Sequence, residues 1–229
     1  MSAWNLRILS ANLANGLADG DAFADLVEAL EPDVVLVQEL TPRQAEALAR
    51  VLPFGKLEPA RDHKGMGIAL RDPGSVRRLH LPYRSAFVAE VTRAMDEEPI
   101  EVVNLHLAAP HVHPVIQRLR ERRGQLDLVL AHLDDLPRPR RVLGGDLNAT
   151  PLWPAYRRLR ARFDDAAVDA ARRIGRRPGA TWGPWPGSMR LLRIDHVLVR
   201  GLTAVETRVL PLRGSDHSAL LADLTPADS

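Results

Sequence analysis

The amino-acid sequence predicts an α/β fold in which two β-sheets pack face to face, with helices on the outside. Nine segments have the apolar or alternating pattern of β-strands, which is too many for one small parallel sheet. Some of them, such as VVLV at 34–37, are continuously apolar and need cover on both faces. Stacked sheets with outer helices provide that cover for this many strands.

The predicted strands are separated by short polar or helical segments, with no internal repeat and no long linker. They cover residues 6–13, 33–40, 65–70, 85–94, 101–107, 140–148, 193–201, 203–212 and 218–224. We therefore expect residues 1–229 to form one domain.

Four helices are predicted between the strands from start signals and apolar faces. Asp21 is expected to cap the first, and Thr41 followed by Pro42 begins the second. A longer helix covers roughly 114–134, and a fourth follows Pro151. Each carries an apolar stripe at helical spacing, which would pack on a sheet.

Composition excludes some classes of site and compartment. The chain has no cysteine, so any metal must be held by carboxylates, amides or histidines, which favours hard ions such as Mg²⁺, Mn²⁺ or Ca²⁺. The N-terminus lacks the features of a signal peptide and no apolar run is long enough to span a membrane, so we expect a cytoplasmic protein. A net charge of +2 is weak evidence for a polyanionic partner. The oligomeric state stays open.

Polar residues stand where the predicted strands end or begin. Taken singly, each has an ordinary explanation, such as an exposed strand terminus, a turn, a cap or a hydrogen-bonded core histidine. Their joint occurrence in this order is harder to explain without a shared site. They are Asn12, Glu39, His106, Asp146, Asn148, Asp195, Asp216 and His217.

The segments SANL, VQEL, NLHL, GGDLNATP, RIDHVLV and GSDHSALL follow one another over about 210 residues. In this order they resemble the endonuclease/exonuclease/phosphatase superfamily, which includes deoxyribonuclease I, exonuclease III type enzymes and neutral sphingomyelinases. The resemblance implies a four-layer α/β/β/α sandwich of two mostly antiparallel mixed sheets. It also implies magnesium-dependent hydrolysis of a phosphate ester.

The resemblance implies a metal site made by three of these residues. Glu39 would be the main Mg²⁺ ligand, with Mn²⁺ or Ca²⁺ as alternatives, and Asn12 would orient that carboxylate or bind the ion itself. Asp216 would serve a second or alternate metal position. The family's abasic endonucleases usually carry an acidic residue where Ala14 stands, so this site has one fewer candidate ligand.

The same resemblance gives catalytic roles to five residues. Asp146 would align or deprotonate the attacking water, while Asn148 and His106 would donate hydrogen bonds to the phosphate. His217 would contact the phosphate or transfer a proton, with Asp195 holding its other ring nitrogen. The glutamate that supports the equivalent of His106 in deoxyribonucleases is missing from the GMGIAL segment at 65–70.

Several other residues remain open to two interpretations. His196 alternates with Asp195 along one strand and is therefore excluded from the site, and Glu90 fits an outward strand residue better than a supporting carboxylate. Arginine clusters occur at 118–123, 157–162 and 172–177, and the first two fit solvated helix faces or, less well, a phosphate track. Four residues are candidates for contacting substrate at the cleft: Trp182, Trp185, His111 and His113.

The sequence thus favours a divalent-metal-dependent phosphodiesterase, with nucleic acid, DNA or RNA, as the preferred substrate because of the arginine content. The alternative is a phosphatase or a sphingomyelinase-like phosphodiesterase acting on a small or lipid substrate. A non-catalytic polyanion-binding protein on the same scaffold is disfavoured, because a degraded site should have lost some of the polar residues.

Overall fold

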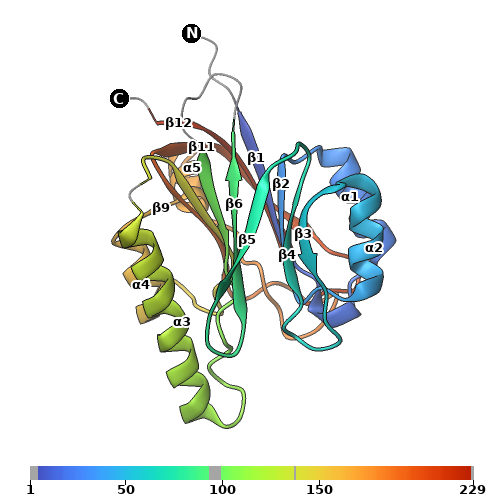
Figure 1. Cartoon of the computed structure of the whole chain (residues 1–229), viewed down its shortest axis with the longest axis horizontal. Helices are drawn as coiled ribbons and strands as arrows, with labels where there is room; N and C mark the ends of the chain where they lie inside the picture. The colour runs from blue at the N-terminus through green and yellow to red at the C-terminus, as the bar shows by residue number, and fades with distance from the viewer. Residues whose placement is uncertain (1–4, 93–98, 137, 228–229) are drawn as a thin grey trace.

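Two six-stranded sheets form the centre of the molecule, and helices cover their outer faces (Figure 1). The computed structural model describes residues 5–92, 99–136 and 138–227. Among these residues only two strand pairings are parallel, β1 with β2 and β7 with β8. The expected four-layer α/β/β/α sandwich of mostly antiparallel mixed sheets is confirmed.

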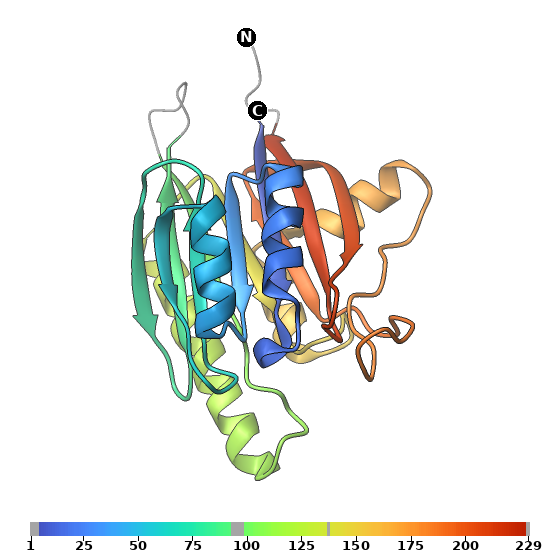
Figure 2. The same cartoon turned by 90° about the vertical axis from the view of Figure 1, so that its right-hand side faces the viewer.

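The first sheet has the strand order β11-β12-β1-β2-β4-β3. Its strands are β1 (Leu6–Asn12), β2 (Val34–Gln38), β3 (Phe54–Glu58), β4 (Met66–Leu70), β11 (Leu202–Pro211) and β12 (Ser218–Pro226). Helices α1 (Gly20–Leu30) and α2 (Pro42–Val51) lie side by side over its outer face, as Figure 2 shows. A short 3₁₀ turn, η1 (Ala14–Gly16), follows β1.

The second sheet has the order β5-β6-β7-β8-β10-β9. Its strands are β5 (Ser75–His80), β6 (Ser85–Val91), β7 (Ile100–Asn104), β8 (Arg141–Asp146), β9 (Asp164–Asp165) and β10 (Asp195–Arg200). Helices α3 (Val115–Asp135) and α4 (Pro154–Arg160) cover its outer face, while α5 (Ala166–Arg173) packs against β10 and β11.

Three apolar clusters correspond to the three contacts between layers. The largest lies between the sheets and includes Leu36, Phe87 and Val197. A second lies under α3 and α4, and the third lies under α1 and α2. The continuous run at 34–37 is buried along its whole length because it is covered on both faces, as its pattern predicts.

Three strands and one helix of the described residues were not predicted from the sequence. The strands β3, β5 and β9 are all at sheet edges, where exposed residues carry no clear apolar pattern. The helix α5 buries only alanines, which give a weak periodic signal. Residues 93 and 94 of the strand expected over 85–94 lie outside the described residues.

The helix starts are partly as expected. Thr41 is the N-cap of α2, and its backbone N–H donates to Gln44 Oε1 at 3.0 Å, so that prediction is confirmed. The prediction that Asp21 caps α1 is wrong, because Asp19 holds that position and accepts from the Ala22 N–H. Asp21 lies inside the first turn and pairs with Arg50. None of the helices in the described ranges has the length and apolar content needed to cross a bilayer.

Candidate active site

The polar strand ends meet at one end of the sandwich, the lower end in Figure 1. β1, β2, β7 and β8 end there, and β10 and β12 begin there, because these last two strands are antiparallel to their neighbours β8 and β1. The register places Asp195 directly across from Asp146. Neighbouring strand ends therefore carry the predicted site residues to one place.

A cleft of about 420 Å³ opens at this end. Its lining includes five of the predicted residues, namely Glu39, Asp146, Asn148, Asp216 and His217. Asn12, His106 and Asp195 lie behind this lining and are almost completely buried. The structure thus brings all eight strand-end residues to the cleft or directly behind it.

Asp146 is the centre of the arrangement. Its Oδ2 accepts hydrogen bonds from Asn12 Nδ2 at 3.0 Å and Asn148 Nδ2 at 3.2 Å, and lies 3.4 Å from His106 Nε2. Burial, and then the charge of Asp195, raise the pKa of this carboxyl to about 7. A carboxylate with such a pKa is a suitable general base near neutral pH.

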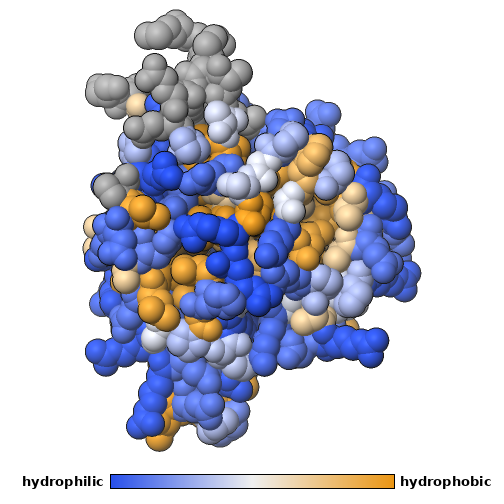
Figure 3. Space-filling model, in the orientation of Figure 1, coloured by the Kyte–Doolittle hydropathy of each residue, from blue (hydrophilic) through white to orange (hydrophobic). Residues whose placement is uncertain are grey.

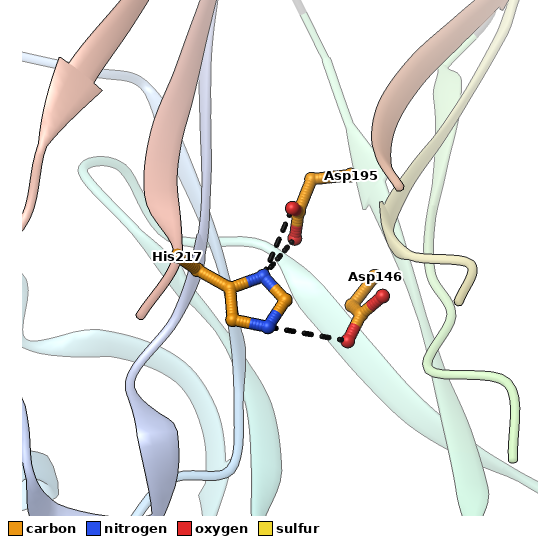
Figure 4. Close-up of side chains that lie close together, drawn as sticks. All are labelled: Asp146, Asp195 and His217. Carbon is orange, nitrogen blue, oxygen red and sulfur yellow. Dashed lines mark hydrogen bonds and ion pairs between the residues drawn. The ribbon is translucent and has the colours of Figure 1, made fainter. Parts of the chain in front are cut away.

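His217 and Asp195 form a buried pair beside Asp146 (Figure 4). His217 Nδ1 donates to Asp195 Oδ2 at 2.9 Å, and its Nε2 lies 3.9 Å from Asp146 Oδ2. Burial alone would lower the pKa of His217, but the charge of Asp195 raises it to about 10. The imidazole is therefore a cation at neutral pH, with its Nε2 side facing the cleft.

His106, in contrast to His217, is neutral. Its side chain is 1% exposed, and neither ring nitrogen has a hydrogen-bond partner within the described residues. Burial, followed by the charge of Arg84, lowers the pKa of His106 well below 6.5. A neutral histidine here fits the absence of the supporting glutamate noted in the sequence, because no carboxylate holds the proton on Nδ1.

Three predicted metal ligands differ in how they face the cleft. Glu39 follows β2 in a left-handed backbone conformation (φ 54°) and accepts from His63 Nδ1 at 2.8 Å. Asn12 turns its amide nitrogen to Asp146, while its Oδ1 accepts from the Ala14 N–H at 2.9 Å. Asp216 Oδ2 accepts from Trp182 Nε1 at 3.0 Å.

A different set has the geometry of a compact ligand cluster. One ligand atom each of Asp146, Asp195 and His217 lies within 4.8 Å of the others. His217 Nδ1 carries a proton and donates a hydrogen bond to Asp195, and a protonated nitrogen cannot bind a metal. These three residues are therefore better suited to hold a proton in place than to bind a metal ion. Glu39 keeps a carboxylate at the cleft wall and is the better ligand for a hard ion.

The four candidate substrate contacts divide into two groups. Trp182 and His111 line the cleft, whereas Trp185 and His113 are not among its lining residues. Trp185 is 64% exposed and stands further out on its loop. Contact of any of the four with substrate stays a prediction.

The exclusion of His196 and the preference for an outward-facing Glu90 both agree with the structure. His196 lies on the opposite face of β10, where its Nε2 bonds the Ala149 carbonyl and its ring packs on Tyr156. Glu90 pairs with Arg138 at 2.6 Å, on β6 and away from the cleft lining. Neither residue belongs to the site.

Sequence reasoning missed several residues at the cleft, including His63, Tyr83, Arg84 and Trp153. Tyr83 and Arg84 precede β6 in a loop with no motif, and His63 lies in another such loop, so no sequence signal identified them. The Nε and Nη1 groups of Arg84 are buried and have no hydrogen-bond partner in the described part of the chain.

One arginine of the 118–123 cluster supports the site directly. Arg122 is buried and donates to the carbonyls of Ala108 and Leu147, both at 2.9 Å. These carbonyls lie in the segments that follow His106 and Asp146, so α3 holds both segments in place. Arg118 places its guanidinium 3.8 Å from the centre of the Tyr83 ring at the cleft wall. The predicted solvated face therefore describes only part of this cluster.

Known proteins resemble this chain in sequence pattern and in fold. A model of the Endonuclease/Exonuclease/phosphatase family matches residues 3–217, whereas no curated protein sequence matched. A structure of an endonuclease/exonuclease/phosphatase from Beutenbergia cavernae is similar, with a TM-score of 0.76, 21% identity and coverage of 97% of this chain and 72% of that one.

Two further solved structures are similar to this chain over nearly its whole length. Humanized D. rerio TDP2 gives a TM-score of 0.73 at 20% identity, covering 96% of this chain and 98% of that one. The mannosyl-6-phosphatase Bt3783 of Bacteroides thetaiotaomicron gives a TM-score of 0.69 at 17% identity, and the match covers 96% of this chain and 99% of that one. At these identities the likeness concerns the fold alone.

Proposed function

The chain belongs to the endonuclease/exonuclease/phosphatase family, and we propose that it is a divalent-metal-dependent phosphodiesterase that hydrolyses nucleic acid by in-line attack of water. The observation that carries this proposal is the arrangement around Asp146, where a buried carboxylate of raised pKa stands between a neutral and a cationic histidine. We further propose that the whole chain works as one domain.

The residues around Asp146 have complementary tasks in this mechanism. Asp146 accepts the proton of the attacking water, and the Asn12 amide fixes the rotamer of its carboxylate. Asn148, in a left-handed conformation (φ 44°), is held by its N–H bond to Asp146 Oδ1 at 2.8 Å. Its amide, which donates to Asp146 Oδ2 and to the Leu107 carbonyl, turns to a phosphate oxygen once substrate is bound.

The two histidines stabilise the charge that develops on the phosphoryl group. His217 presents an imidazolium that Asp195 keeps charged and oriented, so it donates from Nε2 to a non-bridging oxygen. His106 is neutral and donates one N–H to the same group. Because Asp195 holds His217 before substrate arrives, that donor needs little reorganisation during the reaction.

The carboxylates of the cleft fit a hard divalent cation. Glu39 would be the main ligand from the cleft wall, and Asp216 would serve a second or alternate metal position. The Asn12 amide, which here bonds Asp146 and the Ala14 N–H, would have to turn to orient the Glu39 carboxylate or bind the ion. Asp146 and Asp195 are two buried carboxylates in cross-strand register, and a nearby dication would offset the cost of their burial. When bound, the ion supplies Lewis-acid polarisation of the phosphoryl oxygen.

The cleft walls favour a nucleotide over a purely hydrophilic substrate. Tyr83, Trp153 and Trp182 line it from three different segments, with Arg84 and Arg118 beside Tyr83. Aromatic side chains bind bases by stacking, and arginines bind the phosphate backbone. This combination supports single-stranded nucleic acid as the substrate class.

A substrate panel tests the proposal. Wild-type protein is assayed with single-stranded DNA, RNA, bis(p-nitrophenyl) phosphate, p-nitrophenyl phosphate and sphingomyelin, each with Mg²⁺, with Mn²⁺ and with chelator. We expect chelator-sensitive turnover of the diesters, with nucleic acid preferred. Preferential turnover of the monoester would favour a phosphatase, turnover of sphingomyelin alone a lipid phosphodiesterase, and salt-sensitive DNA binding without hydrolysis a binding protein.

A further inference from the structure

A second hollow of about 380 Å³ lies next to the catalytic cleft, at the open edge of the sandwich. The edge strands of the two sheets, β3 and β5, come together there. Tyr83 and Arg84 line both the hollow and the cleft, so the two spaces are neighbours across these residues. In Figure 3 a hydrophilic band runs down the middle of this face, where Figure 1 places β5.

The charged residues of the hollow are mainly cations. Lys64, Arg78 and Arg84 line it against a single carboxylate, Glu58. Glu58 pairs with Arg78 and, at 3.2 Å, with Lys56, so its charge is already matched. Lys64 pairs with Asp62 at 3.7 Å, and its Nζ lies 5.2 Å from the centre of the Tyr83 ring. The hollow therefore has excess positive charge.

Arg84 is a buried side chain at the boundary between the hollow and the cleft. It is 7% exposed, and its buried Nε and Nη1 groups have no hydrogen-bond partner among the residues that the structure describes. Leaving a buried guanidinium with unused donors is costly, and a phosphate oxygen would satisfy them. Its position between the two spaces fits a ligand that extends from one into the other.

We propose that the hollow between β3 and β5 is a second phosphate subsite, which binds the phosphate next to the scissile one in a nucleic-acid strand. The inference rests on the proposed function. Lys64 and Arg78 bind this second phosphate, and Arg84 lies between the two phosphates. A substrate with one phosphodiester group would leave the subsite empty, so the subsite selects strands over small diesters.

The test compares the variants Lys64→Gln and Arg78→Gln on two substrates with Mg²⁺. One is hexathymidylate, which has neighbouring phosphates, and the other is thymidylyl-thymidine, which has a single phosphodiester. We expect KM for hexathymidylate to rise about 3- to 10-fold in each variant, as for the loss of one partly exposed ionic contact, with kcat little changed. Both constants for thymidylyl-thymidine should stay at the wild-type values.

Arg77→Gln is the matched control, because Arg77 is adjacent on β5 but turns to His132 of α3 on the other face. It should leave KM for both substrates unchanged. Equal losses on both substrates, an unchanged KM for hexathymidylate in the Lys64 and Arg78 variants, or an equal effect of Arg77→Gln would overturn the subsite.

A binding measurement separates this inference from the proposed function. Fluorescein-labelled hexathymidylate is titrated in chelator at several salt concentrations, so no hydrolysis is needed. Each of the two variants should reduce the slope of log K against log salt by about 0.7, the value for one lost contact to a single strand. An unchanged slope overturns the subsite, whereas wild-type protein that binds but hydrolyses neither substrate overturns only the proposed function.

Discussion

Replacing Asp195 by Asn should remove the charge that keeps His217 protonated. In the native protein the pKa of His217 is about 10 compared with the ordinary 6.5, which corresponds to roughly 5 kcal/mol in favour of the imidazolium. The carboxylate contributes both its charge and the hydrogen bond at 2.9 Å. Without that charge, burial still lowers the pKa of His217 and only the smaller contributions of Asp146 and Asp216 raise it, so the imidazole should become neutral near pH 7.

Nitrogen NMR of the imidazole measures this directly. In chelated wild-type protein His217 should stay protonated from pH 6 to 9, whereas in Asp195→Asn it should titrate below 6.5. The rate of metal-dependent diester hydrolysis at pH 7.5 should fall by about 10²- to 10⁴-fold, as for the loss of a charged catalytic group. Asp164→Asn, which changes an exposed carboxylate, should alter neither the titration nor the rate.

The protonation of His217 also changes the free energy of unfolding with pH. Because the folded pKa of about 10 lies above the unfolded value, His217 stabilises the protein fully below about pH 6.5. That stabilisation should be lost as the pH rises from 6.5 towards 10, and urea unfolding in chelator should show this fall in the wild type but not in Asp195→Asn. A His217 that stays protonated at pH 8 in Asp195→Asn would refute the reasoning.

Two further predictions concern the scaffold of the site. Asp165 is fully buried and pairs with Arg193 at 2.6 Å. In urea titrations Asp165→Asn should therefore reduce the free energy of unfolding by about 3–5 kcal/mol. Asp164→Asn, which changes an exposed carboxylate, should change it by less than about 1 kcal/mol. A Cβ at Gly145 (φ 133°) would lie 2.1 Å from the Leu105 carbonyl oxygen, so Gly145→Ala should lower the melting temperature far more than Gly175→Ala, where φ is also positive but no atom lies within 4 Å. Similar losses in either pair would contradict the packing described for that position.

For the two glycines before Asp146, the sequence predicts a close approach but does not identify the neighbour. Their small size indicates a close approach, by substrate or by neighbouring backbone. The structure gives the neighbour, since Gly145 is against the Leu105 backbone and a Cβ at Gly144 would meet the Leu36 side chain at 2.6 Å. Both glycines therefore allow close packing of neighbouring residues around β8.

Site residues at buried strand ends were predictable because burial gives such strands a clear pattern, and the polar residue that ends it stands out. Glu39, Asp146 and His217 are of this kind. Tyr83 and Arg84 were not, because they lie in the loop after β5, an exposed edge strand whose own pattern is weak. Only the pairing of β5 with β6 brings that loop to the cleft.

The central claim is that Asp146 is the base of a metal-dependent phosphodiesterase. Its most direct test is the rate of Mg²⁺-dependent hydrolysis of bis(p-nitrophenyl) phosphate by Asp146→Asn, with circular dichroism to verify the fold. The isosteric amide keeps the buried shape but cannot accept the proton, so the rate should fall by about 10²- to 10⁴-fold with the fold intact. A folded Asp146→Asn protein with the wild-type rate would contradict the account.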